Sequence, residues 1–180
     1  MRSKAFFING GAGRVITSIP AFEKYAETHD DFIIVCEGGM NFYKSHPVLH
    51  KYAYDIWHKG LFEDKIKERD CITPEPYRRW HYYNQKCSIA QAFDMEINGV
   101  DEPRELTRPS IKLAKHEGIQ GLQLVDEAIK VTGRDKVIVV QPFGRGVQDE
   151  GGYIFDPTSR SFNLGDISKI INAVSYTHLR

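Results

Sequence analysis

The first forty residues place a glycine cluster between a short apolar run and an amphipathic helix, and a second apolar run follows that helix. The first run covers residues 4–9 and stops at Gly10-Gly11-Ala12-Gly13. Apolar residues then recur every three to four positions over 15–26, which predicts a helix. Residues 31–36 are apolar almost throughout, as in a strand covered on both faces. Strand, glycine loop, helix and strand form a βαβ unit with a right-handed crossover, so we expect an α/β fold with a parallel sheet.

The rest of the chain continues to alternate between helical periodicity and short apolar runs. Periodic spacing predicts helices over 88–97, 121–132 and 166–174, and the charged segment 61–69 is expected to form a short helix. Apolar runs predict strands over 70–73, 111–114 and 137–140. Residues 48–56 fit either a strand or a helix. Asp166 is expected to cap the last helix, and Pro20 to kink the first helix or lie near its start.

Composition and charge are those of an ordinary globular protein, with 41% hydrophobic and 27% charged residues. The formal net charge is zero, so no electrostatic attraction to nucleic acid or an anionic membrane is expected. No apolar run approaches the ~20 residues that span a bilayer, and the apolar start is too short for a signal peptide. We therefore expect a cytoplasmic protein whose three cysteines, Cys36, Cys71 and Cys87, remain thiols.

The first glycine loop has the composition of a phosphate-binding turn. Gly10, Gly11 and Gly13 let backbone N–H groups approach a phosphate, and the following helix N-terminus adds partial positive charge. Glu37 ends the second predicted strand, where an acid binds a ribose hydroxyl in nicotinamide-dependent enzymes. The dinucleotide fingerprint is incomplete, because its third glycine position holds Ile16. A strand-to-helix turn also needs glycine for steric reasons alone, and that interpretation stays open.

A second strand-and-glycine loop occurs at residues 137–146, which predicts a second doubly wound sheet. The sequence is accordingly expected to hold an N-terminal Rossmann-like domain over 1–133 and the incomplete start of a C-terminal domain over 134–174. Residues 175–180 resemble the translated read-through of a sequencing adapter at the end of a metagenomic gene fragment, and we expect them to be an artefactual tail.

Four segments together carry a family resemblance. Gly13 to Phe22 resembles the motif Gly-Asp-apolar-apolar-x-Thr/Ser-x-Pro-Ala-Leu of the heptosyltransferase-like glycosyltransferases of family 9. Gln85 to Ile97 followed by Arg108 to Leu113 is similar to the family's helix, proline and strand before its interdomain region. Val137 to Gly146 is similar to the first strand and loop of its C-terminal domain, and Arg160-Ser161-Phe162 to its Lys/Arg-x-Trp segment.

The resemblance implies a GT-B fold, in which two Rossmann-like domains face each other. Such an enzyme transfers a sugar from a nucleotide-sugar donor to a glycan or other small-molecule acceptor, with inversion and without a metal or other cofactor. The acceptor lies mainly against the first domain and the nucleotide mainly against the second. Since most of the donor domain would be missing, the resemblance implies that these 180 residues alone are inactive.

The sequence departs from the family at its proposed catalytic base, because the family's acid falls on Arg14. Arginine stays protonated and cannot accept a proton. Glu37 is then the best-placed base, or the protein binds without transferring. Arg14 is either a bidentate ligand for an anionic substrate or a solvated residue at a helix start. Four later residues are expected to contact the donor diphosphate: Gly144, Arg145, Gly146 and, by the resemblance, Arg160.

An aromatic segment and a histidine pair complete the candidates. Tyr77, Trp80, Tyr82 and Tyr83, interleaved with Arg78, Arg79 and His81, are suited to stack a sugar or a base, although packing onto the core is the stronger expectation. His46 and His50 are four residues apart, but Pro47 between them argues against a helical metal site. An NAD(P)-dependent oxidoreductase and a non-catalytic nucleotide- or sugar-binding protein remain the alternatives to a glycosyltransferase.

Overall fold

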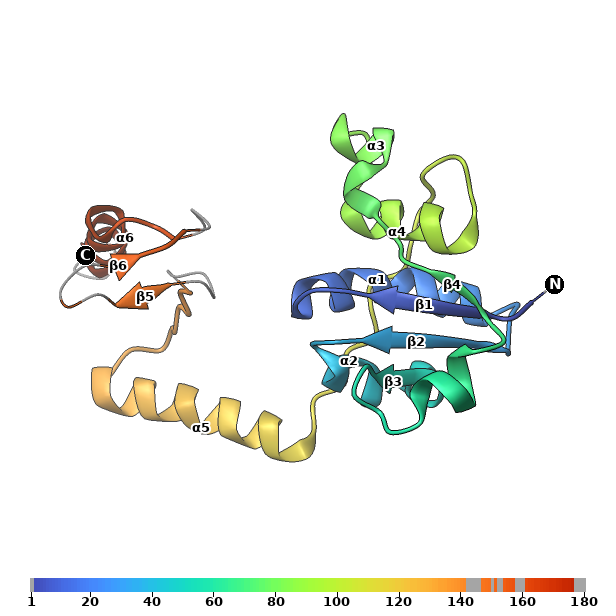
Figure 1. The fold of residues 1–180 in the computed structure, drawn as a ribbon. Coiled ribbons are helices and arrows are strands. Elements are labelled where there is room, and N and C mark those ends of the chain that lie inside the picture. The colour runs from blue at the N-terminus through green and yellow to red at the C-terminus, as the bar shows by residue number, and fades with distance from the viewer. Residues whose placement is uncertain (1, 142–146, 150, 152–153, 158–160, 177–180) are drawn as a thin grey trace. The chain divides into compact units, whose positions relative to one another are not determined.

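A computed structural model of the chain describes residues 2–141, 147–149, 151, 154–157 and 161–176 (Figure 1). The chain forms two compact units, residues 1–120 and 121–180, with the division inside helix α5 (Lys115–Thr132). In the described residues, no helix combines the length and the apolar character that crossing a bilayer requires.

The first unit contains a four-stranded sheet in which all strands are parallel. The strands are β1 (Lys4–Ile8), β2 (Phe32–Cys36), β3 (Ala53–Asp55) and β4 (Asp70–Ile72). Their order is β3-β2-β1-β4, so the chain moves outward from β1 to β3 and then returns to the other side of β1. This order and pairing are those of a Rossmann-like α/β fold, and the switch point lies between β1 and β4.

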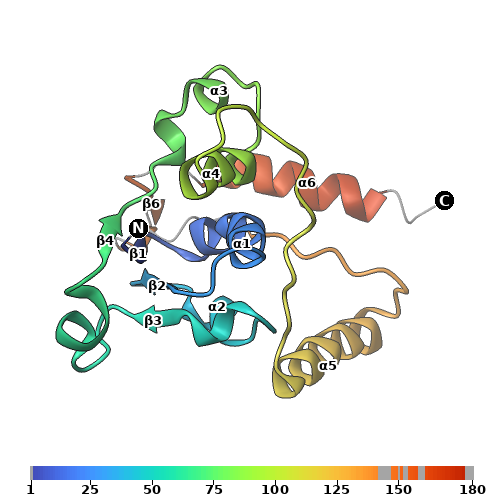
Figure 2. The same cartoon turned by 90° about the vertical axis from the view of Figure 1, so that its right-hand side faces the viewer.

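Helices and turns join these strands. They are α1 (Ala12–Ala26), α2 (Met40–Lys44), η1 (Leu49–Lys51, a 3₁₀ turn), η2 (Phe62–Ile66, a π-helical turn), η3 (Pro76–Arg78, a 3₁₀ turn), α3 (Trp80–Tyr83) and α4 (Ile89–Asn98). Figure 2 shows α1, α2 and α4 along one side of the strands. Gly99 ends α4 in the left-handed conformation, as the Asn-Gly pair predicts.

The two faces of the sheet are covered unequally. On the helical face, alternate strand residues such as Phe6, Ile8 and Ile34 pack with Phe22 and Phe93 in a large buried cluster. On the other face, Ala5, Ile33 and Val35 pack against Leu61, just before the η2 turn, and Ile66, its last residue. Burial on both faces explains why the two central strands are apolar at nearly every position.

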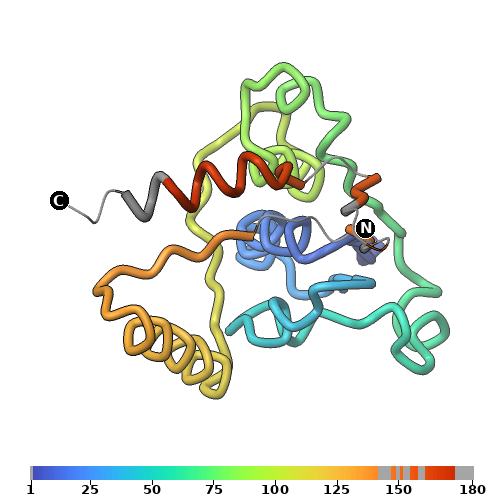
Figure 3. The backbone as a smooth tube through the Cα atoms, turned by 90° about the vertical axis from the view of Figure 1, so that its left-hand side faces the viewer, coloured from blue at the N-terminus to red at the C-terminus, as the bar shows by residue number. Residues whose placement is uncertain are grey.

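The connection after α4, residues 99–114, is irregular but attached to the helical layer. Arg104 donates two hydrogen bonds to the buried carboxylate of Asp94, at 2.6 and 2.9 Å. The Arg104 carbonyl accepts a hydrogen bond from Gln91 Nε2 at 3.0 Å, and the Ser110 N–H donates to Glu23 Oε1 at 3.3 Å. Figure 3 traces the chain through this connection into α5.

The second unit holds most of α5, two short strands and one further helix. The strands β5 (Gln148–Asp149) and β6 (Ile154–Phe155) pair antiparallel, and α6 covers Leu164–Tyr176. None of the residues of α5 is buried. Val139 is 87% exposed, so the run of apolar residues at 137–140 is not part of a core within the described residues.

Most predicted elements of the first unit are confirmed, while three expectations are wrong. Residues 111–114 and 137–140 are not strands, because a strand needs a neighbour to pair with and the described residues provide none beside them. Asp166 is not the cap of α6, since its own N–H donates to Asn163 Oδ1 at 2.9 Å. Residues 48–56 contain both a 3₁₀ turn and β3, and Pro20 lies inside α1.

Candidate functional site

The turn between β1 and α1 is built from glycines and leaves the helix start open. Gly10 has φ +97°, a conformation that L side chains rarely adopt, and a Cβ there would lie 3.1 Å from Arg14 Cδ. Gly11 is the N-cap of α1 in an extended conformation, and no side chain caps the helix. A Cβ at Gly11 or Gly13 would meet nothing within 4 Å. Within the first turn, the Arg14 N–H donates to the Gly11 carbonyl at 3.0 Å, while the N–H groups of Ala12 and Gly13 have no acceptor among the described residues, and no acidic residue lies in that turn.

A second glycine loop, between β2 and α2, packs on this turn. A Cβ at Gly38 would lie 3.2 Å from the Gly10 carbonyl oxygen, and one at Gly39 would lie 3.1 Å from Ala12 Cα. Both positions are thus kept small by the close approach of the two loops. Glu37, which begins the second loop, is exposed. The fold consequently brings Glu37 and the first glycine turn to the same edge of the sheet, as their positions at strand ends predict.

Arg14 lies on the other side of the turn, at the switch point between β1 and β4. Its Nη2 donates to the Pro74 carbonyl at 2.8 Å, and its Nη1 is 3.8 Å from Glu75 Oε2. The guanidinium carbon lies 5.3 Å from the centroid of the Tyr77 ring and 5.6 Å from that of Phe93. Both distances lie within the range of cation–π interactions.

The Arg14 side chain is only 16% exposed, so it is not a solvated residue at a helix start. Its buried Nε has no hydrogen-bond partner in the described part of the chain. The guanidinium instead ties the first turn of α1 to the segment that follows β4.

Asp55 is a carboxylate at this edge that the sequence analysis did not single out. It ends β3, is partly buried, and accepts the Trp57 N–H at 2.9 Å through Oδ1. A position at the end of a strand is the feature that could have identified Asp55 from sequence. Residues 48–56 fit either a strand or a helix, however, so the sequence does not show that a strand ends there. The negative charge of Asp55 also acts on its neighbour Cys36.

Cys36 is not suited to act as a nucleophile. Burial, with a smaller contribution from the nearby Asp55, raises the pKa of its thiol to about 11, although Lys44 acts in the opposite direction. The thiol lies 3.3 Å from the Met40 sulfur, inside the main core. Since the thiolate is the reactive form, this cysteine is inert at neutral pH. All three cysteines are free thiols.

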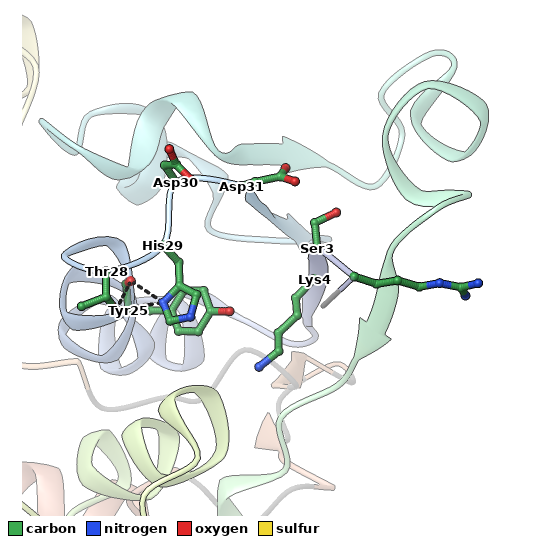
Figure 4. A pocket seen from close by; sticks show the side chains of 8 residues that line it. Ser3, Lys4, Tyr25, Thr28, His29, Asp30 and Asp31 are labelled. Atoms are coloured by element: carbon green, nitrogen blue, oxygen red, sulfur yellow. Dashed lines mark hydrogen bonds between the residues drawn. The ribbon is translucent and has the colours of Figure 1, made fainter.

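One open hollow lies at the opposite, amino-terminal edge of the sheet (Figure 4). It has a volume of about 190 Å³, and its lining includes Lys4, Tyr25 and His29. The rings of Tyr25 and His29 stack with centroids 3.9 Å apart, and His29 Nδ1 lies 3.2 Å from the Tyr25 carbonyl oxygen. Ligands of parallel sheets bind beyond the carboxyl ends of the strands, so we place the candidate site at the glycine turn rather than in this hollow.

The His46 ring is engaged in structural contacts. Its Nε2 lies 2.8 Å from Glu23 Oε1, and its Nδ1 accepts the N–H groups of Val48 and Leu49. His50 Nδ1 lies 2.9 Å from the His46 carbonyl oxygen. Across the residues that the structure describes, no group of three or more His, Cys, Asp or Glu side chains is arranged to hold a metal ion.

The remaining predicted site residues lie outside the described part of the chain. These are Gly144, Arg145, Gly146 and Arg160. Their assignment to the donor diphosphate stays a prediction, as does the division into domains at residue 133.

Searches with protein-family models, curated protein sequences and solved structures find no match to this chain.

Proposed function

We propose that this chain contains the acceptor-side domain of an inverting GT-B glycosyltransferase, which transfers a sugar from a nucleotide donor to a hydroxyl acceptor. The observation that carries the proposal is the uncapped glycine turn at the carboxyl end of β1, with an exposed carboxylate on the adjoining loop. The motif from Gly13 to Phe22, which resembles that of family 9, adds the reaction class.

The glycine turn supplies the site for a phosphate. First-turn N–H groups that no carbonyl of the helix can reach bind anions, and the helix dipole adds to the attraction. The open space in front of Gly11 and Gly13 admits the donor diphosphate close to the backbone. The same groups stabilise the charge that develops on the diphosphate as its bond to the sugar breaks.

Glu37 is the proposed base. As the acceptor hydroxyl oxygen attacks the anomeric carbon, its proton passes to the Glu37 carboxylate, and the bond to the diphosphate breaks on the opposite face. Arg14 does not take part in that proton transfer, because it remains charged and donates to the Pro74 carbonyl. We assign Arg14 a positioning role, since it fixes α1 against the segment after β4.

One observation favours a second function. Glu37 follows β2 at the position where an acid binds the ribose hydroxyls of a nicotinamide cofactor. A dehydrogenase would use the glycine turn for the pyrophosphate in the same way. The two functions differ in the ligand that binds the turn and in whether a sugar is transferred.

A binding experiment separates these functions. Saturation-transfer NMR of the protein with UDP-glucose, ADP-glucose, GDP-mannose and NADH should show contact with at least one nucleotide sugar. Gly13→Ala should weaken that contact, because a Cβ would enter open space in front of the turn. Gly118→Ala, also in a helix and with nothing within 4 Å, is the matched control. Binding of NADH alone would favour the dehydrogenase, and no effect of Gly13→Ala would place the ligand elsewhere.

The base is tested by turnover. In a longer version that carries a complete donor domain, given a nucleotide sugar and a panel of acceptors, Glu37→Gln should abolish transfer while leaving nucleotide binding unchanged. Glu68→Gln, at another exposed glutamate, should leave both unchanged. Near-normal transfer by Glu37→Gln would remove Glu37 from this role.

A further inference from the structure

Residues 77–83, the aromatic arm, carry large side chains that the core does not use. None of the α3 residues is buried, and Trp80 and Tyr83 are 63% and 80% exposed. They are three positions apart on one helical turn, so their rings lie on the same side. The expectation that this segment packs onto the core is therefore wrong for these two residues. Figures 1 and 2 both show α3 beyond α4, on the side away from the sheet.

The backbone that carries these rings is firmly held. Arg79 forms an ion pair with Glu96 and donates to the Met95 carbonyl at 3.3 Å, which attaches the arm to α4. His81 Nε2 lies 3.3 Å from Glu102 Oε2. Exposed rings on an anchored backbone form a preorganised surface, which lowers the entropic cost of binding a ligand.

The arm begins beside the candidate site. Tyr77 covers one face of the Arg14 guanidinium, and the Tyr77 and Tyr82 rings meet edge to face with centroids 5.7 Å apart. Through Arg14, the base of the arm touches the first turn of α1.

Acidic residues border the arm, since Glu75 precedes it and Glu96 and Glu102 contact Arg79 and His81, but two cations in and beside it stay unpaired within the described part of the chain. Residues 76–93 contain Arg78, Arg79 and Lys86 and neither aspartate nor glutamate. Arg79 is paired with Glu96, whereas Arg78 and Lys86 are exposed and have no ion-pair partner among the described residues. Two exposed aromatic rings beside two unpaired cations form a surface complementary to a flat, negatively charged ligand.

We propose that the aromatic arm binds a carbohydrate that bears carboxylate, sulfate or phosphate groups, and that this carbohydrate is the acceptor of the proposed transfer. That this carbohydrate is an acceptor rests on the proposed function, whereas the binding surface is argued from the aromatic arm alone. The C–H face of a pyranose ring stacks on Trp80 and Tyr83, and the acidic groups reach Arg78 and Lys86. Single-stranded nucleic acid stacks on aromatic rings as well, but it requires a basic groove that follows its backbone. A chain of zero net charge with three local cations does not provide one.

The chain offers a direct optical test, because Trp57 and Trp80 are its two tryptophans. Trp57→Phe leaves Trp80 as the reporter, and Trp80→Phe leaves Trp57, which is 83% exposed after β3, as the matched control. Each protein is titrated with hexasaccharides of hyaluronan, galacturonan and heparin, with neutral cellohexaose and with dT6. An acidic hexasaccharide should shift Trp80 emission to shorter wavelength in a saturable way and leave Trp57 emission unchanged.

Two further variants define the contacts. Tyr83→Ala should raise the dissociation constant of the acidic hexasaccharide by about fivefold or more, as expected for loss of one stacking ring. Arg78→Gln should reduce the preference over cellohexaose. No saturable shift with any acidic hexasaccharide, or an equal response from Trp57, would overturn the proposal. Tighter binding of dT6 would assign the arm to nucleic acid instead.

Failure of this inference and failure of the proposed function give different results. One outcome is transfer to an acidic glycan in which Trp80→Ala does not change the acceptor KM. That outcome would refute the role of the arm and keep the transferase. Saturable binding at Trp80, with no transfer from any nucleotide sugar by a longer version that carries a complete donor domain, would keep the arm and refute the transferase.

Discussion

Replacing Gly11 by aspartate should separate stability from ligand binding at the glycine turn. Gly11 is the N-cap of α1 with φ −85° and ψ −176°, a conformation open to any residue, and a Cβ there meets nothing within 4 Å. Aspartate is a favoured N-cap residue, because its carboxylate accepts first-turn N–H groups, and its gain over glycine is a few tenths of a kcal/mol. The helix dipole adds about 0.3–1 kcal/mol.

The combined gain is about 0.5–1 kcal/mol, which raises Tm by roughly 2–5 °C for a unit of this size. Differential scanning calorimetry measures it directly. The folded-state pKa of a carboxylate at a helix N-terminus is lowered, so the gain is present at neutral pH and is lost as the pH falls below about 4.

The same carboxylate should repel a bound phosphate. Two unit negative charges about 4 Å apart oppose each other by about 4 kcal/mol at an effective dielectric of 20, which corresponds to at least a hundredfold loss of affinity. Gly11→Asn is the control, since it caps the helix without charge and should retain much more binding. A lower Tm for Gly11→Asp would show that the first-turn N–H groups are not available, and unchanged nucleotide affinity would show that phosphate does not bind there.

Three further outcomes test the surroundings of the site and the core. Arg104→Ala leaves the buried Asp94 carboxylate without a cation and with only the neutral Asn98 amide as a side-chain donor. Urea unfolding should show a loss of about 2–3 kcal/mol, less than for a fully buried pair because Arg104 is partly exposed. Burial raises the pKa of the Cys36 thiol to about 11 and also raises that of Tyr43. Both groups favour their neutral forms in the folded state. Their contribution to the free energy of unfolding is therefore complete below about pH 9 and is lost as the pH rises toward 11. Thermal melts at pH 8 that match those at pH 11 would refute this. Arg14→Asp should lose about 2–4 kcal/mol, because the Pro74 carbonyl, Glu75 and two ring faces all favour a cation, whereas Arg14→Lys should lose less.

The β1–α1–β2 unit is predictable from sequence because its signals are local. Glycines end one run, three-to-four spacing defines the helix, and a continuous apolar run marks a central strand. The run at 137–140 carries the same local signal, yet it is exposed. Strand formation depends on a partner elsewhere in the chain, and residues 137–140 do not indicate whether one is present.

The candidate site is likewise only partly predictable from sequence. The positions of Gly11 and Glu37 at strand ends are sufficient to bring them to one edge of the sheet. The environment of Arg14 is not predictable in this way, since the carbonyl that it binds is 60 residues away in the chain. Of the two roles expected from sequence, the solvated arginine is wrong and the anion ligand stays a prediction. The fold adds what sequence does not indicate, the contacts of the guanidinium with two aromatic rings.

That arrangement decides which carboxylate at this edge is available for chemistry. The surroundings of Arg14 favour a cation, so position 14 cannot take over the part of an acid. Three carboxylates follow strand ends nearby. Asp55 already accepts the Trp57 N–H, and Glu75 lies within ion-pair distance of Arg14. For Glu37 alone among the three, the described residues provide no hydrogen-bond donor or ion-pair partner, and it is exposed on the loop that packs against the glycine turn. If a proton is taken from an acceptor at this edge, Glu37 is the group with a free carboxylate to receive it.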